Sequence, residues 1–297
     1  MTSLSSALVR PCLTDSEYRL MRELIQQEAG IFLAPTKKAL LAGRLLPRLR
    51  DLGLTSFREY HHYVTQQDPA ERARMLDCIS TNETHFFREP RQFEFLEQRL
   101  IPHWKAAVAQ GLRRRRIRVW SAACSSGEEP YSLAMTLLTH LPAEEGWGLE
   151  ILASDISNRV LRQAQAATWP LDRAEEIPDH HLRRFMLKGT RSQAGWMRAG
   201  VELRAAVQVE RINLHAASYP VAGRFDLIFC RNVLIYFDVA TKERVVRQLA
   251  SHLEPGGHLF LGHAESLLGR SQELENVGPT VYRSGGRPAP AAVRCAP

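Results

Sequence analysis

The spacing of apolar residues divides the chain into a helical first part and a second part in which strands and helices alternate. Up to residue 95, apolar positions recur at helical intervals, as at Leu20, Leu24 and Ile25, and no strand-like run occurs before residue 117. This pattern predicts helices over about residues 14–30, 36–52, 55–65 and 69–80.

The first two of these helices carry signals for their ends and faces. Thr14 and Glu17 form the Thr-x-x-Glu pattern of a capping box, and Gly30 is a typical helix terminator. Pro47 is expected to kink or split the second helix, because proline has no backbone N–H. The apolar face of that helix consists of Leu41, Leu45, Leu49 and Leu52.

Beyond residue 117, short β-prone runs alternate with helical segments, which indicates a parallel sheet covered by helices. We expect helices at 128–141, 157–167 and 239–253. The expected strands are 117–120, 150–155, 206–212, 225–230 and 258–263.

These patterns predict a helical N-terminal domain over residues 1–90 and an α/β domain over residues 91–284. Residues 170–209 interrupt the alternation and are expected to form a small antiparallel subdomain within the second domain. Residues 285–297 are rich in proline, glycine and alanine, and we expect a disordered tail there.

The composition favours a cytoplasmic protein. No apolar run approaches the roughly 20 residues of a membrane-spanning helix, and the N-terminus lacks the pattern of a signal peptide. The five cysteines are scattered without CxxC spacing, so neither a disulfide framework nor a metal site is indicated.

Positive charge is concentrated in two places. Basic residues outnumber acidic ones by 39 to 32, and the excess lies almost entirely in residues 96–120, around the Arg113–Arg116 run. Residues 31–50 contain no acidic residue but carry Lys37, Lys38, Arg44, Arg48 and Arg50. Such patches attract acidic partners, although a solvated surface explains each of them equally well.

Ligands of a parallel α/β sheet bind beyond the carboxyl ends of its strands. The first predicted strand runs into a loop of small residues that ends in Gly127, Glu128 and Glu129, and the second ends at Asp155. Glycine permits a tight turn and close approach to the backbone. An acidic residue at the end of the next strand is suited to hydrogen bonding with ribose hydroxyls.

The charge of this loop indicates the class of ligand. The loop lacks the glycines of a dinucleotide fingerprint and the lysine of a P-loop, and its carboxylates repel phosphate. S-adenosylmethionine has a ribose, an ammonium and a sulfonium but no phosphate, so Glu129 could pair with the ammonium and Asp155 with the ribose. Alternatively, Glu128 and Glu129 are first-turn residues of a helix and Asp155 caps one.

Several segments match a known family in order. They are TNETHFFREP (81–90), VWSAACSSGEEPYSLAMTL (119–137), ASDIS (153–157), INL (212–214), FDLIFCRNVLIYF (225–237) and LEPGGHLFLGHAESL (253–267). From the residues alone, TNETHFFRE is expected to be a capped helix start that Phe86 and Phe87 anchor in the core. Over about residues 14–283 the chain resembles the CheR-type chemotaxis receptor methyltransferases. The resemblance implies a small all-helical domain, followed by a Rossmann-like S-adenosylmethionine-binding α/β domain with a small antiparallel insertion.

The resemblance also implies an activity and a set of site residues. Members of the family transfer a methyl group from S-adenosylmethionine to chemoreceptor glutamates, which yields glutamyl methyl esters and S-adenosylhomocysteine. In this sequence the implied catalytic residues are Arg88, Arg231 and Tyr236. The implied cofactor-binding residues are Asn82, Thr84, Arg88, Glu129, Asp155, Asn213, Leu214, Arg231 and Asn232.

The implied partners are chemoreceptors. Their cytoplasmic helical bundles are expected to contact Lys37, Lys38, Arg44 and Arg48. A receptor C-terminal peptide is a possible second partner at the antiparallel subdomain, although Gly189-Thr190-Arg191 departs from the GTG-like turn of members that use this tether. Neither nucleic acid nor membrane insertion is expected.

Three other functions use similar features. A nucleic-acid methyltransferase would explain the Arg113–Arg116 run, but RNVLIYF is not its usual Asn/Asp-Pro-Pro-Tyr motif. A catalytically silent protein with the same fold would bind no cofactor. A dinucleotide-dependent oxidoreductase is disfavoured by the missing glycines.

Overall fold

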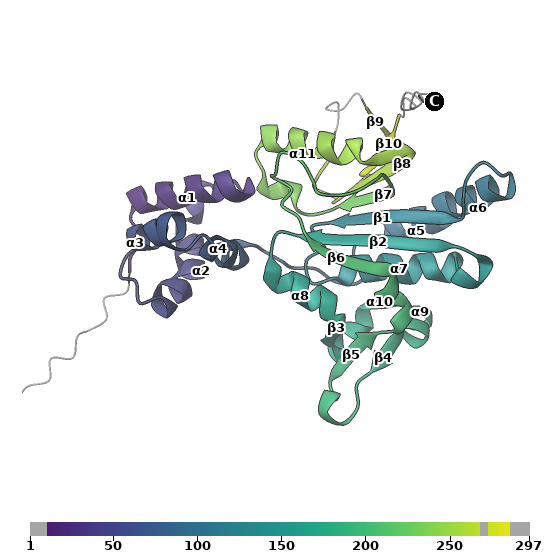
Figure 1. The fold of residues 1–297 in the computed structure, drawn as a ribbon, viewed down its shortest axis with the longest axis horizontal. Coiled ribbons are helices and arrows are strands. Elements are labelled where there is room, and N and C mark those ends of the chain that lie inside the picture. The colour runs from purple at the N-terminus through teal and green to yellow at the C-terminus, as the bar shows by residue number, and fades with distance from the viewer. Residues whose placement is uncertain (1–10, 268–272, 286–297) are drawn as a thin grey trace, which may run out of the picture. The chain divides into compact units, whose positions relative to one another are not determined.

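The computed structural model describes residues 11–267 and 273–285, which fall into two compact units that divide between residues 81 and 82 (Figure 1). The prediction of a disordered tail concerns residues 285–297, of which 286–297 lie outside the described residues.

The first unit is helical, as the apolar spacing predicts. It contains α1 (Asp15–Ala29), α2 (Lys38–Asp51), α3 (Phe57–His62) and α4 (Glu71–Ile79), with a 3-10 turn at Pro35–Lys37 and a π-helical turn at Tyr63–Gln67. The predicted capping box of α1 is present, since Glu17 N donates to Thr14 Oγ1 and Thr14 N donates to the Glu17 carboxylate. The helix ends at Gly30, whose φ is 71°.

Helix α2 continues through Pro47 to Asp51, so the proline does not split it. Pro47 cannot donate to the carbonyl of Gly43, but both residues are exposed, and water can satisfy that carbonyl. Leu41, Leu45 and Leu49 are buried, as their spacing predicts.

The second unit is built on a seven-stranded sheet in the order β6-β2-β1-β7-β8-β10-β9. The first five strands in this order are mutually parallel, whereas β10 is antiparallel to β8 and to β9. Their bounds are β1 (Arg116–Ala122), β2 (Gly148–Asp155), β6 (Val207–Arg211), β7 (Phe225–Cys230), β8 (Leu253–Leu261), β9 (Leu274–Gly278) and β10 (Val281–Ser284).

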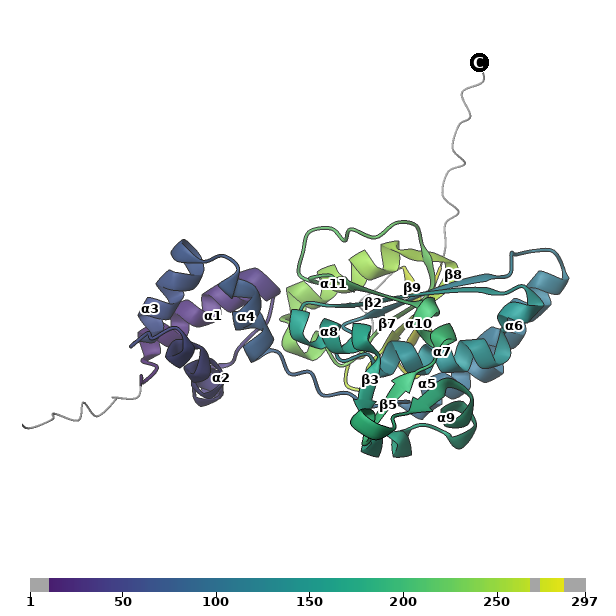
Figure 2. The ribbon, with the colours of Figure 1, turned by 60° about the horizontal axis from the view of Figure 1, so that its bottom comes forward.

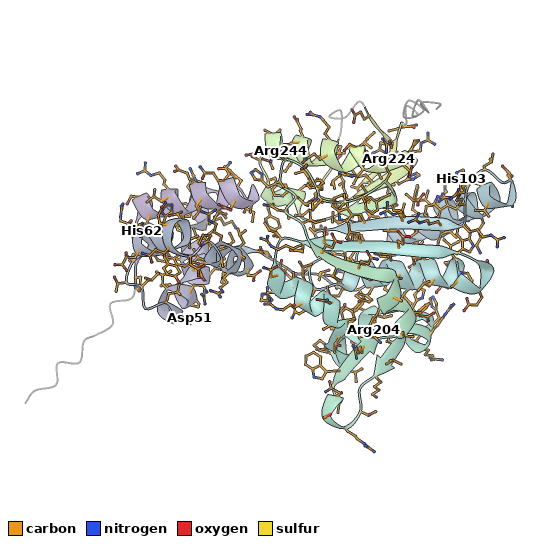
Figure 3. The ribbon with its side chains drawn as sticks, in the orientation of Figure 1. Asp51, His62, His103, Arg204, Arg224 and Arg244 are labelled. Atoms are coloured by element: carbon orange, nitrogen blue, oxygen red, sulfur yellow. The ribbon has the colours of Figure 1, made fainter. Side chains whose placement is uncertain are left out.

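Helices cover both faces of this sheet (Figures 1 and 2). On one face lie α5 (Pro90–Phe95), the π-helical turn Leu96–Leu100, α6 (Ile101–Ala109), α7 (Glu128–His140) and α8 (Asn158–Ala166), and on the other lies α11 (Val239–Ser251). Along β7, Leu227 and Phe229 join one buried cluster while Ile228 and Cys230 join the other. Side chains fill the space between sheet and helices (Figure 3). The parallel part therefore has the three-layer, doubly wound architecture expected.

A second, three-stranded antiparallel sheet lies in the insertion, in the order β3-β5-β4. It consists of β3 (Thr168–Pro170), β4 (Met186–Lys188) and β5 (Trp196–Ala199), with a 3-10 turn at Leu171–Glu176, α9 (Asp179–Phe185) and α10 (Val201–Ala206) beside them. The antiparallel sheet was expected from the sequence, whereas α10, on VELRAA, was not.

Three local features differ from the sequence-based expectation. Strand β8 begins at Leu253, and its pairing with β7 is irregular between Phe225 and Leu227. The polar strand β9 and its partner β10 were not predicted from the sequence. Residues 82–89, taken from the residues alone, suggested a capped helix start, but they form no helix, and α5 begins only at Pro90.

Candidate functional site

The residues singled out at the strand ends lie at one edge of the sheet. Strands β6, β2, β1 and β7 are consecutive parallel neighbours, so their carboxyl ends meet at that edge. Asn213 follows β6, Asp155 ends β2, the loop to Gly127 follows β1, and Arg231 follows β7. The order of the sheet reverses between β1 and β7, which is where ligands of doubly wound sheets bind.

The loop after β1 has an unusual backbone. Ala123, Ser125 and Gly127 all have positive φ, at 69°, 50° and 102°. A Cβ on Gly127 would lie 3.0 Å from both Cα and Cβ of Ala164 in α8. Glycine is therefore required there both for its conformation and for close packing, and the prediction of a tight turn at this position is confirmed.

Asp155 is connected to this loop and to the motif at residues 82–89. Its Oδ2 accepts from Ser125 N at 3.0 Å and its Oδ1 from Ser157 N at 3.0 Å. Ser125 Oγ in turn donates to the carbonyl of Asn82 at 2.8 Å. The side-chain Nδ2 of Asn82 is buried without a hydrogen-bond partner. A buried donor without an acceptor is costly, which indicates that a ligand completes this part of the site.

Glu129 lies in a buried ion pair with Arg231. Arg231 Nε donates to Glu129 Oε2 at 2.6 Å, and Ser121 Oγ donates to Glu129 Oε1 at 2.7 Å. The Glu129 side chain is 9% exposed and that of Arg231 only 2%. A carboxylate can accept about four hydrogen bonds, so these two contacts leave Glu129 able to accept from an ammonium group.

The guanidinium of Arg231 has several further partners within the second unit. Besides Glu129, its Nη1 donates to the Arg88 carbonyl at 2.6 Å and to Gln92 Oε1 at 3.3 Å. Its guanidinium also lies 5.5 Å from the ring centre of Phe229. This arrangement favours a role for Arg231 in holding Glu129 and the Arg88 backbone, rather than in contacting a substrate carboxylate.

The TNETHFFREP motif combines an apolar anchor with polar groups near the strand ends. Phe86 is 1% exposed and contacts Trp169 edge to face at 5.0 Å, while Phe87 stacks on His181 at 5.2 Å. Phe86 N donates to Glu176 and Phe87 N to Ser132 Oγ. The expected anchoring role of the phenylalanines is therefore confirmed. These bonds connect the motif to Glu176 and Ser132 of the second unit.

Arg88 and Tyr236 are the partly exposed residues among the predicted catalytic groups. Among the residues that the structure describes, the Arg88 side chain makes one hydrogen bond, a 3.2 Å contact from Nη1 to the carbonyl of Glu83. Tyr236 lies in a 3-10 turn, Leu234–Tyr236, directly after the segment that carries Arg231 and Asn232. Both side chains can therefore approach a substrate more easily than Arg231 can.

The other predicted cofactor residues make hydrogen bonds that hold the backbone of their segments in place. The Thr84 carbonyl accepts from Arg173, and the Leu214 carbonyl accepts from Tyr219 Oη at 2.9 Å. Asn213 Oδ1 accepts from His215 N at 2.9 Å, which fixes the turn after β6.

Glu265 is a residue of this edge that sequence reasoning missed. Its carboxylate accepts from the amides of Asn232, Ile235 and Gly262 at 2.7–3.1 Å, and so fixes the segment that carries Tyr236. Burial raises the pKa of this carboxyl, and the amide donors oppose that shift. Its place in the quoted GHAESL segment was the signal that could have identified it.

Glu89 is a second carboxylate that was not predicted. Its Oε1 accepts from Asn232 Nδ2 at 3.5 Å and from His263 N at 3.2 Å, and its Oε2 lies 3.7 Å from Arg231 Nη1. Carboxylates thus outnumber guanidinium groups at this edge: Glu89, Glu128, Glu129, Asp155 and Glu265 against Arg88, Arg173 and Arg231. An acidic site with an unpartnered amide suits a cationic nucleoside such as S-adenosylmethionine and disfavours a phosphate.

The cysteines near the site are buried thiols. Burial, with Asp155 and Glu129 close to the first of them, raises the pKa of Cys124 well above its usual value, and burial does the same for Cys230. A thiol held protonated is a poor nucleophile, so neither cysteine is suited to covalent catalysis. Cys295 lies outside the described residues.

The Arg113–Arg116 run lies at the other end of β1, and two of its four charges are paired with carboxylates of the same unit. Arg113 pairs with Asp226 at 2.9 Å and Arg116 with Glu150 at 2.6 Å, whereas Arg115 donates to the carbonyl of Glu145. Internal ion pairs therefore account for half of the charge of this run.

Two of the predicted receptor-binding cations on α2 are likewise engaged. Arg48 forms a bidentate ion pair with Glu71, with two hydrogen bonds of 2.8 Å each, and the Glu71 side chain is 0% exposed. This pairing lowers the pKa of Glu71 despite its burial. Arg44 donates to the carbonyl of Ile79 and to Thr81 Oγ1.

Lys37 and Arg50 remain as exposed cations of α2 and the turn before it, and neither has an ion pair within the part of the chain that the structure describes. Lys38 pairs with Asp15 at 2.6 Å. The exposed face between Lys37 and Arg50 carries Leu40, which is 44% exposed, and Pro47.

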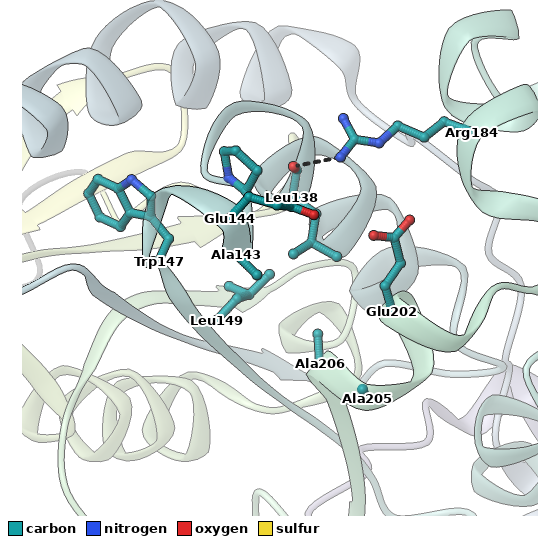
Figure 4. A pocket seen from close by; sticks show the side chains of 10 residues that line it. Leu138, Ala143, Glu144, Trp147, Leu149, Arg184, Glu202, Ala205 and Ala206 are labelled. Carbon is teal, nitrogen blue, oxygen red and sulfur yellow. Dashed lines mark hydrogen bonds between the residues drawn. The ribbon is translucent and has the colours of Figure 1, made fainter.

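A cavity of about 250 Å³ lies elsewhere in the second unit, near the start of β2 (Figure 4). Trp147, Leu149 and Arg184 are among its lining residues, and Arg184 donates to the carbonyl of Leu138. None of the predicted site residues lines this cavity, because Leu149 lies near the beginning of β2 and Asp155 is at its end.

The described residues contain no cluster of side chains that could hold a metal ion. Within residues 11–267 and 273–285, no helix is long and apolar enough to cross a membrane.

Comparison with known proteins agrees with this geometry. Residues 82–283 match the family model described as CheR methyltransferase, SAM binding domain, and residues 16–80 match CheR methyltransferase, all-alpha domain. Chemotaxis protein methyltransferase 2 of Pseudomonas aeruginosa is 40% identical over 91% of this chain and 93% of its own. The chemotaxis protein methyltransferases of Salmonella typhimurium and Escherichia coli are each 39% identical over 92% of this chain, and over 91% and 92% of their own. The chain therefore belongs to the CheR methyltransferase family.

Proposed function

We propose that this protein methylates glutamate side chains of chemoreceptors, with S-adenosylmethionine as methyl donor and S-adenosylhomocysteine as second product. The observation that carries the proposal is the meeting of Asn82, Glu129 and Asp155 at one acidic sheet edge, in a chain of this methyltransferase family. The same edge lacks the glycines and the positive charge that a dinucleotide oxidoreductase needs.

In this proposal Glu129 accepts from the ammonium of the cofactor and Asp155 from its ribose hydroxyls. The buried Nδ2 of Asn82 donates to the cofactor and thereby gains the partner that it lacks. Arg231 orients Glu129 through the 2.6 Å bond between them. Thr84, Asn213, Leu214 and Asn232 complete the wall through backbone and amide groups.

The chain's own part in the reaction is positioning and electrostatics. Bound S-adenosylmethionine supplies an electrophilic methyl group on a positively charged sulfur. A glutamate carboxylate is already ionised at pH 7, so no general base is needed. Arg88 and Tyr236 are proposed to orient that carboxylate and to offset its repulsion by the acidic edge, because both side chains are accessible and can donate.

The receptor is proposed to dock on the exposed face of α2. Lys37→Glu and Arg50→Glu should each raise KM for receptor several-fold, since these free cations steer an acidic helix, and the effect should shrink at high salt. Arg19→Glu on α1 is the matched control, because Arg19 is also exposed. Initial rates at low and high salt measure the effect, and equal KM changes at all three positions would contradict a specific role for α2.

Charge reversal at Arg48 is unsuitable for this purpose. It would leave Glu71 buried opposite another carboxylate and would destabilise the helical unit itself.

A receptor C-terminal peptide is proposed to add as a strand to β4. Among the described strands β4 pairs with β5 alone, so its other edge has no strand partner there, and Leu187 on β4 is 58% exposed. The turn that follows has φ 52° at Arg191, so arginine there adopts a conformation that glycine favours. Calorimetric titration with receptor C-terminal peptides tests the proposal, and absence of binding would leave α2 as the proposed receptor surface.

The methylation proposal is tested by incubating the protein with radiolabelled S-adenosylmethionine and membranes that contain chemoreceptors. We expect label on receptor-sized protein, released by base as methanol, because methyl esters hydrolyse readily in base. Label on RNA would instead support a nucleic-acid methyltransferase. Absence of S-adenosylmethionine binding by calorimetry would support a catalytically silent protein.

A further inference from the structure

The segment that enters the small antiparallel sheet is packed against the proposed cofactor edge. Trp169 in β3 is 3% exposed, and its ring contacts those of Phe86 and Tyr131 at centre distances of 5.0 Å. Its Nε1 donates to the carbonyl of Ser126 at 3.3 Å. The start of the insertion thus packs against both the loop after β1 and the TNETHFFREP motif.

Arg173, four residues after Trp169, joins these two parts of the site. One of its nitrogens, Nη2, donates both to the carbonyl of Thr84 and, at 3.2 Å, to Glu128 Oε1. The other, Nη1, lies 3.2 Å from Glu176 Oε1, and Glu176 Oε2 accepts from Phe86 N at 2.9 Å. The Arg173–Glu176 pair therefore bonds to the backbone of the motif at two positions.

The bond to Glu128 connects Arg173 to the first turn of α7. Glu128 is 3% exposed, and its Oε2 accepts from Ser126 Oγ at 2.7 Å. Burial raises the pKa of this carboxyl, and the Arg173 charge opposes the shift. The reading of Glu128 as an ordinary first-turn residue is thus incomplete, because it is a buried ion-pair partner beside Glu129.

We propose that Arg173 is a positioning residue for S-adenosylmethionine, which sets the distance between the motif that carries Asn82 and Thr84 and the helix start that carries Glu129. The identity of the ligand rests on the proposed function. The family resemblance connects the insertion with receptor tethering. In this proposal the insertion has a second role, because Trp169 and Arg173 hold the segments that bind the cofactor.

The test compares Arg173→Met with Arg183→Met in the full chain. Arg183 lies in the same insertion, but its pair with Asp179 is 3.4 Å long and both side chains are more than four-fifths exposed, at 82% and 83%. Calorimetry should show affinity for S-adenosylhomocysteine reduced about tenfold or more in Arg173→Met and unchanged in Arg183→Met, as expected for lost hydrogen bonds of a charged group. KM for S-adenosylmethionine should rise in parallel, with KM for receptor unchanged. Unchanged affinity in Arg173→Met would overturn the proposal.

A second variant separates positioning from folding, because Arg173→Met leaves the buried Glu128 without its counter-ion. The double variant Arg173→Met/Glu128→Gln removes that buried charge, so its melting temperature should recover while affinity for S-adenosylhomocysteine stays reduced. Recovery of both would mean that Arg173 merely neutralises Glu128, and would overturn the proposal. A wild-type protein that binds no S-adenosylhomocysteine would instead refute the cofactor assignment itself, and the positioning role with it.

Discussion

Arg231→Met is expected to lower the free energy of unfolding of the second unit by about 3–5 kcal/mol, the range for removing one partner of a buried ion pair. The cause is Glu129, which would keep its buried position with Ser121 as its remaining hydrogen-bond donor. The variant also loses the bond from Arg231 to the Arg88 carbonyl. Denaturant unfolding followed by circular dichroism measures the change.

The double variant Arg231→Met/Glu129→Gln serves as the control for this result. With the uncompensated charge removed, most of the stability should return, while cofactor affinity should stay low because glutamine cannot ion-pair with an ammonium group. A single variant as stable as the wild type would show that Glu129 does not depend on Arg231, and would reopen a substrate-facing role for the arginine.

Arg88→Ala is expected to reduce kcat about a hundredfold, which is the usual cost of removing one preorganised donor at a reacting centre. Stability should change little, because the Arg88 side chain is partly exposed and makes one 3.2 Å hydrogen bond. Single-turnover methylation of receptor at saturating cofactor measures the effect.

Arg91→Ala is a suitable control for this prediction, because Arg91 is exposed three residues further along the chain. Methyl transfer by Arg88→Ala at the wild-type rate would exclude Arg88 from substrate orientation and leave Tyr236 as the proposed donor. A loss of rate in both variants would indicate a general effect of charge near the site.

The parts of the fold that follow local rules could be predicted from the sequence. The capping box of α1, the leucine face of α2 and the five parallel strands depend on residues close in sequence, and the structure has them. Strand β9 could not be predicted in this way, because LENVG has little apolar character and most of its residues are not buried. It forms through pairing with β10, an interaction between strands that the local pattern does not encode.

The residues of the site could likewise be predicted only in part from the sequence. The placement of Asp155 and Glu129 at one edge follows from the parallel strand order, which alternation predicts. The pairing of Arg231 with Glu129, of Arg48 with Glu71 and of Arg173 with Glu128 does not, because each of these pairs joins residues at least 23 positions apart in the sequence. Some basic residues that the sequence suggests for binding a partner therefore form ion pairs within the fold instead.

The discontinuous construction of the acidic edge has a thermodynamic consequence. The residues proposed to bind the cofactor, Asn82, Glu129, Asp155 and Asn213, come together only when the central strands are paired, so an unfolded chain would present no such site. Ligand then stabilises the folded second unit by mass action, by about 2.7 kcal/mol at a concentration one hundred times Kd. Because ligand binding stabilises the second unit alone, a higher concentration of methyl donor lowers the unfolded fraction of that unit. Proteolysis of the second unit should therefore slow as the methyl donor becomes more abundant.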